Sequence, residues 1–380
     1  FANDYGRSPD AGLNAYLADV GGRIAARSHR PGMPYSFQSV NANHLNAYAF
    51  PGGTIACTRG ILCEIEDEAQ LAALLGHETG HVAARHAAER QTQQMLSTLA
   101  VGGLAVAAGR SSRLEGYSDA IYAIGALSVG ALLAYYSRAN ERQADILGME
   151  YMVAAGHGAD GMADLMALLV DEQSRNRNAL DLMFATHPMS SERYETARQL
   201  AGTRYLQTRT WPRNRERYLD STASLQKQAA AIRRLRDGEA DMAAGRHVAA
   251  ESAYRSALAA MPDDYCALVL MAECQSAQGR QQEAAAYLRR AREVDPAGGK
   301  AIHLSGITQL ALGRPDAALA EFQRYEQVLP GNPNTVFLEG VALEGMQARP
   351  AAAERYRVYL GYTTQTPQAR YAIARLQAWR

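Results

Sequence analysis

The C-terminal part of the chain is built on a step of 34 residues, and this feature constrains the fold most. Prolines, glycines and alanines recur at this step, at Pro262, Pro296 and Pro330, at Gly245, Gly279 and Gly313, and at Ala250, Ala284, Ala318 and Ala352. Small residues recur at Gly238, Ala272, Gly306 and Gly340, and large apolar residues at Tyr254, Leu288, Phe322 and Tyr356. Each unit is expected to be a helix pair whose crossing point needs the small residue.

Such units are tetratricopeptide (TPR) repeats, and they stack into a curved solenoid because each buries its apolar face only against its neighbours. We expect about four repeats in residues 231–380, with a capping helix near 367–380. Residues 201–230 are expected to connect them to a domain of residues 1–200. A concave repeat surface typically binds a peptide or protein partner. The alternative is that the solenoid only supports the first domain.

The first domain contains a zinc-binding pattern, His77-Glu78-Thr79-Gly80-His81. The stretch before it predicts a helix that begins after Asp67, with Leu71, Leu74 and Leu75 facing inward. On such a helix His77 and His81 lie one turn apart on one face and can bind a single Zn²⁺. Glu78 lies beside them, where it can hold a water molecule.

A catalytic zinc needs a third protein ligand, and Glu141 is the candidate. It lies in a second predicted helix, one turn before Asp145. In this geometry Glu141 contacts the metal and Asp145 accepts a ring N–H from a ligating histidine. The alternative is that this acidic pair is a solvated helix face. His86 and His44 are expected to be surface or loop residues.

Four segments resemble the Ste- and HtpX-type zinc metallopeptidases, and most of all their periplasmic branch with a C-terminal repeat domain, the BepA type. They are Asn46 to Gly53, His77 to His81, Tyr136 to Asp145 with Glu141 at the ligand position, and Thr186-His187-Pro188 followed by Arg193. The resemblance covers about residues 1–200. It implies a mainly α fold with a small β-sheet, a zincin-like domain of the gluzincin type followed by the TPR solenoid.

Residues 46–50 read as an edge strand that ends at Pro51-Gly52-Gly53. An edge strand can hold an extended peptide by main-chain pairing, so Asn46, Ala47, Tyr48 and Ala49 are candidate substrate-binding residues. An ordinary strand is the alternative. His187 precedes a proline and is expected in a loop. The resemblance suggests that it caps the zinc, whereas an oxyanion-stabilising role, together with Arg193, stays open beside a purely structural one.

The resemblance places the protein in the bacterial periplasm, acting on unfolded or misfolded proteins and linked to outer-membrane assembly. The chain begins at Phe1 without a signal peptide, as expected of a processed or truncated product. The chain has 39 basic and 39 acidic residues, so its net charge is zero and does not attract nucleic acid. The apolar segments 95–109 and 120–136 are too short to span a bilayer. We expect a hairpin packed on the first domain, with membrane-surface contact through 95–136 as the alternative.

These observations predict a zinc metalloendopeptidase for protein quality control, with Glu78 as general base. A chaperone-like TPR adaptor with a latent, self-capped zinc site is the rival. A structural zinc scaffold ranks last, because a structural site does not need a glutamate between its histidines. Four cysteines are too few for a disulfide framework, and buried free thiols are expected.

Overall fold

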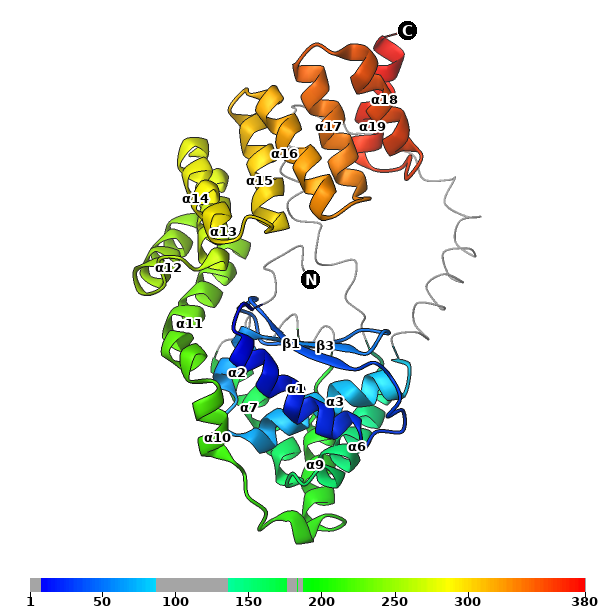
Figure 1. Ribbon diagram of the computed structural model, residues 1–380, viewed down its shortest axis with the longest axis vertical. Coiled ribbons are helices and arrows are strands. Elements are labelled where there is room, and N and C mark those ends of the chain that lie inside the picture. The colour runs from blue at the N-terminus through cyan, green and yellow to red at the C-terminus, as the bar shows by residue number, and fades with distance from the viewer. Residues whose placement is uncertain (1–7, 87–135, 176–182, 184–186, 380) are drawn as a thin grey trace. The chain divides into compact units, whose positions relative to one another are not determined.

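A computed structural model of the chain describes residues 8–86, 136–175, 183 and 187–379 (Figure 1). These residues form two compact units, residues 8–240 and residues 241–379. The first contains a small sheet and helices, and the described residues of the second form helices joined by turns. The expected mainly helical fold, a small sheet followed by helical repeats, is confirmed.

The sheet of the first unit has three strands in the order β1-β3-β2. Strand β1 (Ser36–Val40) runs parallel to β3 (Thr54–Thr58), with Ser36 opposite Thr54. Strand β2 (Ala47–Ala49) runs antiparallel to β3, with Ala47 opposite Cys57. Gly53 makes the turn between them in the left-handed region, at φ 91°. Strand β2 therefore lies at an edge of the sheet.

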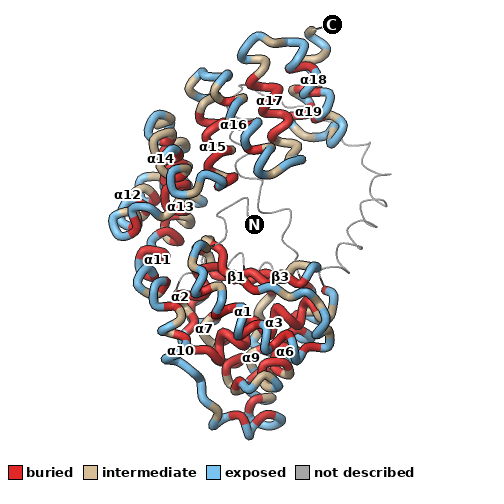
Figure 2. Tube along the Cα trace, viewed as in Figure 1, coloured by how far each residue is buried: buried red, intermediate tan, exposed pale blue. Residues whose placement is uncertain are grey.

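Helices pack below this sheet in Figure 1. Helix α1 contacts β1, α3 contacts β2, and α6 packs along α3. Helix α7 packs against α3 and α9, and α10 contacts α1 and α3. The bounds are α1 (Ala11–Ala25), α2 (Arg59–Glu64), α3 (Glu68–Ala83), α6 (Arg138–Ala154), α7 (Asp160–Arg175), α9 (Ser191–Gly202), η3 (Leu206–Thr208) and α10 (Arg215–Ser221). Helix α3 is the centre of this unit, since it is buried from Glu68 to Val82 (Figure 2).

The start of α3 follows from its sequence. Asp67 is the N-cap, and its carboxylate accepts a hydrogen bond from the Gln70 backbone N–H at 3.0 Å. Gln70 reaches back one residue further than a capping box requires and accepts from the Glu66 N–H at 2.8 Å. A fixed start sets which residues face each side of the helix, so the cap helps to position the histidines two turns and more downstream.

The solenoid consists of antiparallel helix pairs. After α11 (Ala223–Ala243), which runs across the boundary of the units, come α12 (His247–Ala260), α13 (Tyr265–Ala277), α14 (Gln281–Val294), α15 (Gly299–Ala311), α16 (Pro315–Val328), α17 (Pro333–Gly345), α18 (Arg349–Leu360) and α19 (Pro367–Ala378). The glycines of the 34-residue step take the left-handed conformation after each first helix, Gly279 at φ 77° and Gly313 at φ 70°. The small positions lie under the large ones: a Cβ on Gly306 would be 2.4 Å from the Phe322 ring.

Residues 95–135 of the predicted apolar hairpin lie outside the described residues, so neither that hairpin nor its membrane contact is tested. Among the helices in the described ranges, none has the length and apolar character to cross a bilayer.

The four cysteines, Cys57, Cys63, Cys266 and Cys274, are buried free thiols, as expected from the sequence.

Candidate metal centre

The candidate site forms where α3 and α6 come into backbone contact. Gly76 and Gly80 on α3 face Gly148 and Ala144 on α6: a Cβ on Gly76 would lie 2.7 Å from the Gly148 carbonyl oxygen. A Cβ on Gly80 would lie 2.9 Å from the Ala144 carbonyl oxygen. From the sequence Gly80 is only a costly residue within a helix. Its role in the fold is to let α6 approach closely enough for Glu141 to reach the histidines.

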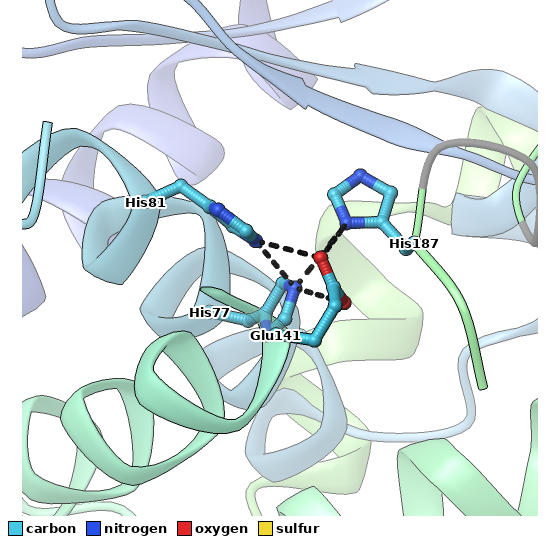
Figure 3. Close-up of side chains that lie close together, drawn as sticks. All are labelled: His77, His81, Glu141 and His187. Atoms are coloured by element: carbon cyan, nitrogen blue, oxygen red, sulfur yellow. Dashed lines mark hydrogen bonds and ion pairs between the residues drawn. The ribbon is translucent and has the colours of Figure 1, made fainter. Parts of the chain in front are cut away.

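Four ligand atoms converge at this crossing (Figure 3). His77 Nε2 lies 3.0 Å from His81 Nε2, and Glu141 Oε1 lies 3.3 Å from His81 Nε2. His187 Nδ1 lies 3.2 Å from Glu141 Oε1 and 3.4 Å from His77 Nε2. All four side chains are buried, and their ligand atoms lie within 4.8 Å of one another.

These separations fit a metal ion. Zinc–nitrogen bonds of about 2.0–2.1 Å in a tetrahedron put neighbouring ligand atoms roughly 3.3 Å apart. Three imidazoles and one carboxylate are also the donor types that zinc prefers. The residues present therefore fit a tetrahedral Zn²⁺, with His187 Nδ1 in the fourth position.

A second layer of polar groups holds the ligands. His77 Nδ1 lies 2.9 Å from Asp145 Oδ1, so Nδ1–H donates and Nε2 is left to face the ligand cluster. Arg193 donates to both oxygens of Asp145 at 2.6 and 2.7 Å, and its Nη1 lies 2.8 Å from Glu141 Oε2. The structure thus puts the Arg193 guanidinium behind the ligands, against two carboxylates, rather than free for an oxyanion.

His86 belongs to this layer, and the expectation that it is a surface or loop residue is wrong. It is 2% exposed, and its Nδ1 lies 2.9 Å from His81 Nδ1. His86 Nε2 lies 3.1 Å from Gln143 Oε1. Tyr136 stacks on the His81 ring at 3.8 Å between centroids. In the sequence, His86 is marked only by its position five residues after His81. This spacing does not suggest a metal ligand, so sequence reasoning missed its role.

The His86 contacts fix the tautomer of His81. Since Gln143 Oε1 can only accept, His86 Nε2 carries the proton and His86 Nδ1 accepts. His81 Nδ1–H must then donate to it, which leaves His81 Nε2 free to bind a metal.

Burial and charge shift the pKa values of these groups in opposite directions. Burial disfavours a charged His77 ring, but hydrogen bonds to Asp145 and Glu141 outweigh it and raise its pKa to about 10. Burial lowers the pKa of His81 well below the usual value for histidine. Burial also opposes ionisation of Glu141, yet the facing histidines, His187 first, hold its pKa far below the usual range. The free site is therefore one with an ionised Glu141 and a protonated His77.

Glu78 lies beside the ligand cluster without joining it. Its Oε1 is 3.8 Å from His187 Nε2, and its Oε2 has no hydrogen-bond partner among the described residues. Burial is the largest influence on Glu78 and raises its pKa. A buried carboxylate with a free oxygen and a raised pKa is suited to accept and return a proton.

The candidate substrate strand adjoins the site. Strand β2 contains Ala47, Tyr48 and Ala49. Asn46 precedes it and pairs with the neighbouring strand β3, because its carbonyl accepts a hydrogen bond from the Thr58 N–H. A hollow of about 310 Å³ lies between the end of β2 and the end of α3. Its lining includes Ala49, Phe50, His81 and Arg85. Space for a ligand therefore exists next to both the edge strand and a candidate metal ligand.

Comparisons with known proteins agree with this picture. A model of Peptidase family M48 matches residues 12–201, and a tetratricopeptide repeat model matches residues 241–304. The beta-barrel assembly-enhancing protease of Yersinia pestis is 29% identical over 50% of this chain and 39% of its own length. The mitochondrial metalloendopeptidase OMA1 of Schizosaccharomyces pombe is 31% identical over 47% of this chain and 50% of its own.

The matched part thus covers well under two thirds of these relatives. The solved structure of YrrB, a TPR protein, aligns with 54% of this chain and 97% of its own, at 17% identity and a TM-score of 0.36.

Proposed function

Because this chain belongs to peptidase family M48, a family of zinc-dependent metallopeptidases, we propose that it is a zinc endopeptidase. In this proposal His77, His81 and Glu141 hold the metal, and Glu78 is the general base. The observation that carries it is the set of four buried ligand atoms at the spacing of a zinc tetrahedron, with Glu78 next to them.

The chemistry divides between metal and protein. Zinc, when bound, acidifies a water molecule and polarises a peptide carbonyl. Glu78 Oε2, which lacks a partner among the described residues, takes the proton of the attacking water and passes it to the leaving amine. Asp145 keeps the His77 ring oriented, and Arg193 acts as a positioning residue by binding both Asp145 and Glu141. Strand β2 holds the substrate backbone beside the metal.

His187 makes the resting site latent in this proposal. Its Nδ1 lies among the other three ligand atoms and would occupy the fourth position on a bound zinc, so substrate would have to displace it to reach the metal. In the capped arrangement its Nε2 lies 3.8 Å from Glu78 Oε1. A displaced His187 that stays close to the site can donate to an oxyanion, so the two roles open from the sequence can follow one another. A closed donor set is also what favours the rival function, a TPR adaptor with a permanently capped zinc site.

The wider setting follows from the relatives' names. Several are called beta-barrel assembly-enhancing proteases, which supports a place in the bacterial envelope, in the periplasm, beside outer-membrane protein assembly. We propose misfolded or stalled proteins as substrates, because main-chain pairing to an edge strand demands little of their side chains. The division of labour is residues 1–200 for catalysis, 201–230 as a connection and 231–380 for binding protein partners.

One experiment separates these functions. Zinc-loaded wild type, Glu78→Gln and His187→Ala are incubated with an unfolded protein, and zinc content is measured for each. We expect Glu78→Gln to keep its zinc and to lose at least about a hundredfold in cleavage rate. His187→Ala should cleave faster than wild type. If Glu78→Gln cleaved normally, the mechanism would be wrong, and if no variant cleaved, the adaptor would be favoured.

A further inference from the structure

The solenoid contains a polar cavity that the peptidase chemistry does not use. It measures about 550 Å³ and lies between α14 and α16, with residues of α15 on its floor. Arg289 of α14, Arg314 just before α16 and Arg324 of α16 contribute to its walls, and all three side chains belong to exposed residues. Ser305 and Thr308 of α15 are buried beneath them.

The arginines of this cavity lack the partners that other arginines of the solenoid have. Arg246, Arg280 and Arg375 each pair with a carboxylate, and Arg292, which also lines the cavity, pairs with Glu321 at 2.5 Å. Within the described residues, Arg289, Arg314 and Arg324 have no ion pair or side-chain hydrogen bond. The only unpaired carboxylate described in the lining belongs to Glu293. The walls therefore carry an excess of positive charge that favours an anionic ligand.

The cavity also contains unpaired acceptors. Gln309 and Glu321 both line it, and each keeps one buried oxygen, Oε1 and Oε2 respectively, without a hydrogen-bond partner in the described part of the chain. A fitting ligand should therefore bring N–H donors as well as negative charge. Inorganic phosphate brings the charge without any N–H donor. A polypeptide with acidic side chains brings both, since its backbone supplies the N–H groups.

We propose that this cavity binds an acidic segment of a partner polypeptide, with Arg289, Arg314 and Arg324 contacting its carboxylates. Arginine suits the task because its planar fork matches a carboxylate. The inference deepens the proposed partner-binding role of the solenoid and names the chemistry of that partner. It is independent of zinc and of Glu78, so its failure would leave the peptidase mechanism untouched.

The test measures binding of short fluorescent peptides to the full chain. One peptide alternates Asp and Ser, and its match alternates Asn and Ser. We expect the acidic peptide to bind and the neutral one to bind at least about tenfold more weakly. Added salt should lower the affinity for the acidic peptide. The triple variant Arg289→Gln, Arg314→Gln, Arg324→Gln should lose about tenfold in affinity, and each single variant a part of that loss.

The control is Arg357→Gln on α18, which removes one positive charge from an exposed residue outside the cavity. It should bind the acidic peptide as the wild type does. Circular dichroism checks that the variants fold, and the single variants carry the test if the triple one does not. Equal binding of both peptides, or an unchanged affinity of the arginine variants, would overturn the proposal. So would inorganic phosphate displacing the acidic peptide at equal concentration.

Discussion

At the scale of single residues, the candidate site is set by where protons sit. His77 is oriented by Asp145, and His81 by His86, which in turn is held by Gln143. Each series of hydrogen bonds ends on an oxygen atom that can only accept, and so each directs a histidine Nε2 at the same point. The two metal-binding nitrogens are thereby oriented toward the metal position, although His77 must still lose a proton before it can bind.

Loss of His86 should weaken metal binding without removing a ligand. We expect His86→Ala to raise the dissociation constant for zinc about 10- to 100-fold, because His81 would lose the partner that fixes its tautomer. Competition with a chromogenic chelator measures this constant. His247→Ala, which removes a histidine from the solenoid, should leave it unchanged. Equal constants for His86→Ala and wild type would mean that the His86 contact does not orient His81.

Zinc binding should release a proton near neutral pH. In the free site, hydrogen bonds raise the His77 pKa to about 10 despite burial, so His77 is charged at pH 7 and must lose a proton to bind the metal. His81, with its lowered pKa, is already neutral and releases none. Affinity should thus rise with pH below about 10, by up to about tenfold per unit.

Calorimetry at pH 7 in buffers of different ionisation enthalpy checks the proton count. A binding enthalpy that does not depend on the buffer would contradict a charged His77.

At the scale of the elements, the decisive contact is backbone against backbone between α3 and α6. Periodicity alone predicts two helices with His77, His81, Glu141 and Asp145 on facing sides, because a helix repeats every 3.6 residues. It does not predict His86, whose partner Gln143 comes from the other helix, nor the pairing of Arg193 with Asp145. Such contacts depend on how closely two elements approach, which no pattern within one element encodes. The 34-residue step, by contrast, repeats often enough to define the solenoid from the sequence.

The close approach gives a prediction of opposite sign at two glycines. Gly80→Ala gains about 1 kcal/mol in helix propensity. Its Cβ, however, would lie 2.9 Å from the Ala144 carbonyl oxygen, and this backbone atom cannot move aside as a flexible side chain can. We expect a net loss of about 1–3 kcal/mol in the free energy of unfolding and weaker zinc binding. Gly22→Ala, in α1 with no atom within 4 Å of the new Cβ, should instead stabilise by about 0.5–1 kcal/mol. Urea unfolding followed by circular dichroism compares them.

The solenoid offers a second prediction, at the position where its repeat is imperfect. The left-handed glycine of each turn, as in Gly279 and Gly313, is replaced in the last repeat by Gln347, which takes φ 62°. A side chain costs about 1–2 kcal/mol in this conformation. Gln347→Gly should therefore raise the melting temperature by a few degrees, and Gly313→Gln should lower it. A thermal melt tests both, and equal melting temperatures would contradict the strain.

At the scale of the whole molecule, the two compact units should respond differently to metal. Zinc at about a thousand times its dissociation constant stabilises the unit that binds it by about 4 kcal/mol. We expect a chelator to increase hydrogen exchange in α3 and α6 of the full chain and to leave α13 to α17 unchanged. The double variant His77→Ala, His81→Ala should not respond to the chelator. A uniform response along the chain would show that the units unfold together.

The cluster of four candidate ligands in Figure 3 has one more consequence, through His187. If its imidazole fills the position that substrate needs, every substrate competes with an inhibitor tethered to the enzyme itself, at a local concentration that dilution cannot change. The apparent KM then contains the cost of removing that ring, and a partner that draws His187 away would act as an activator without touching the substrate.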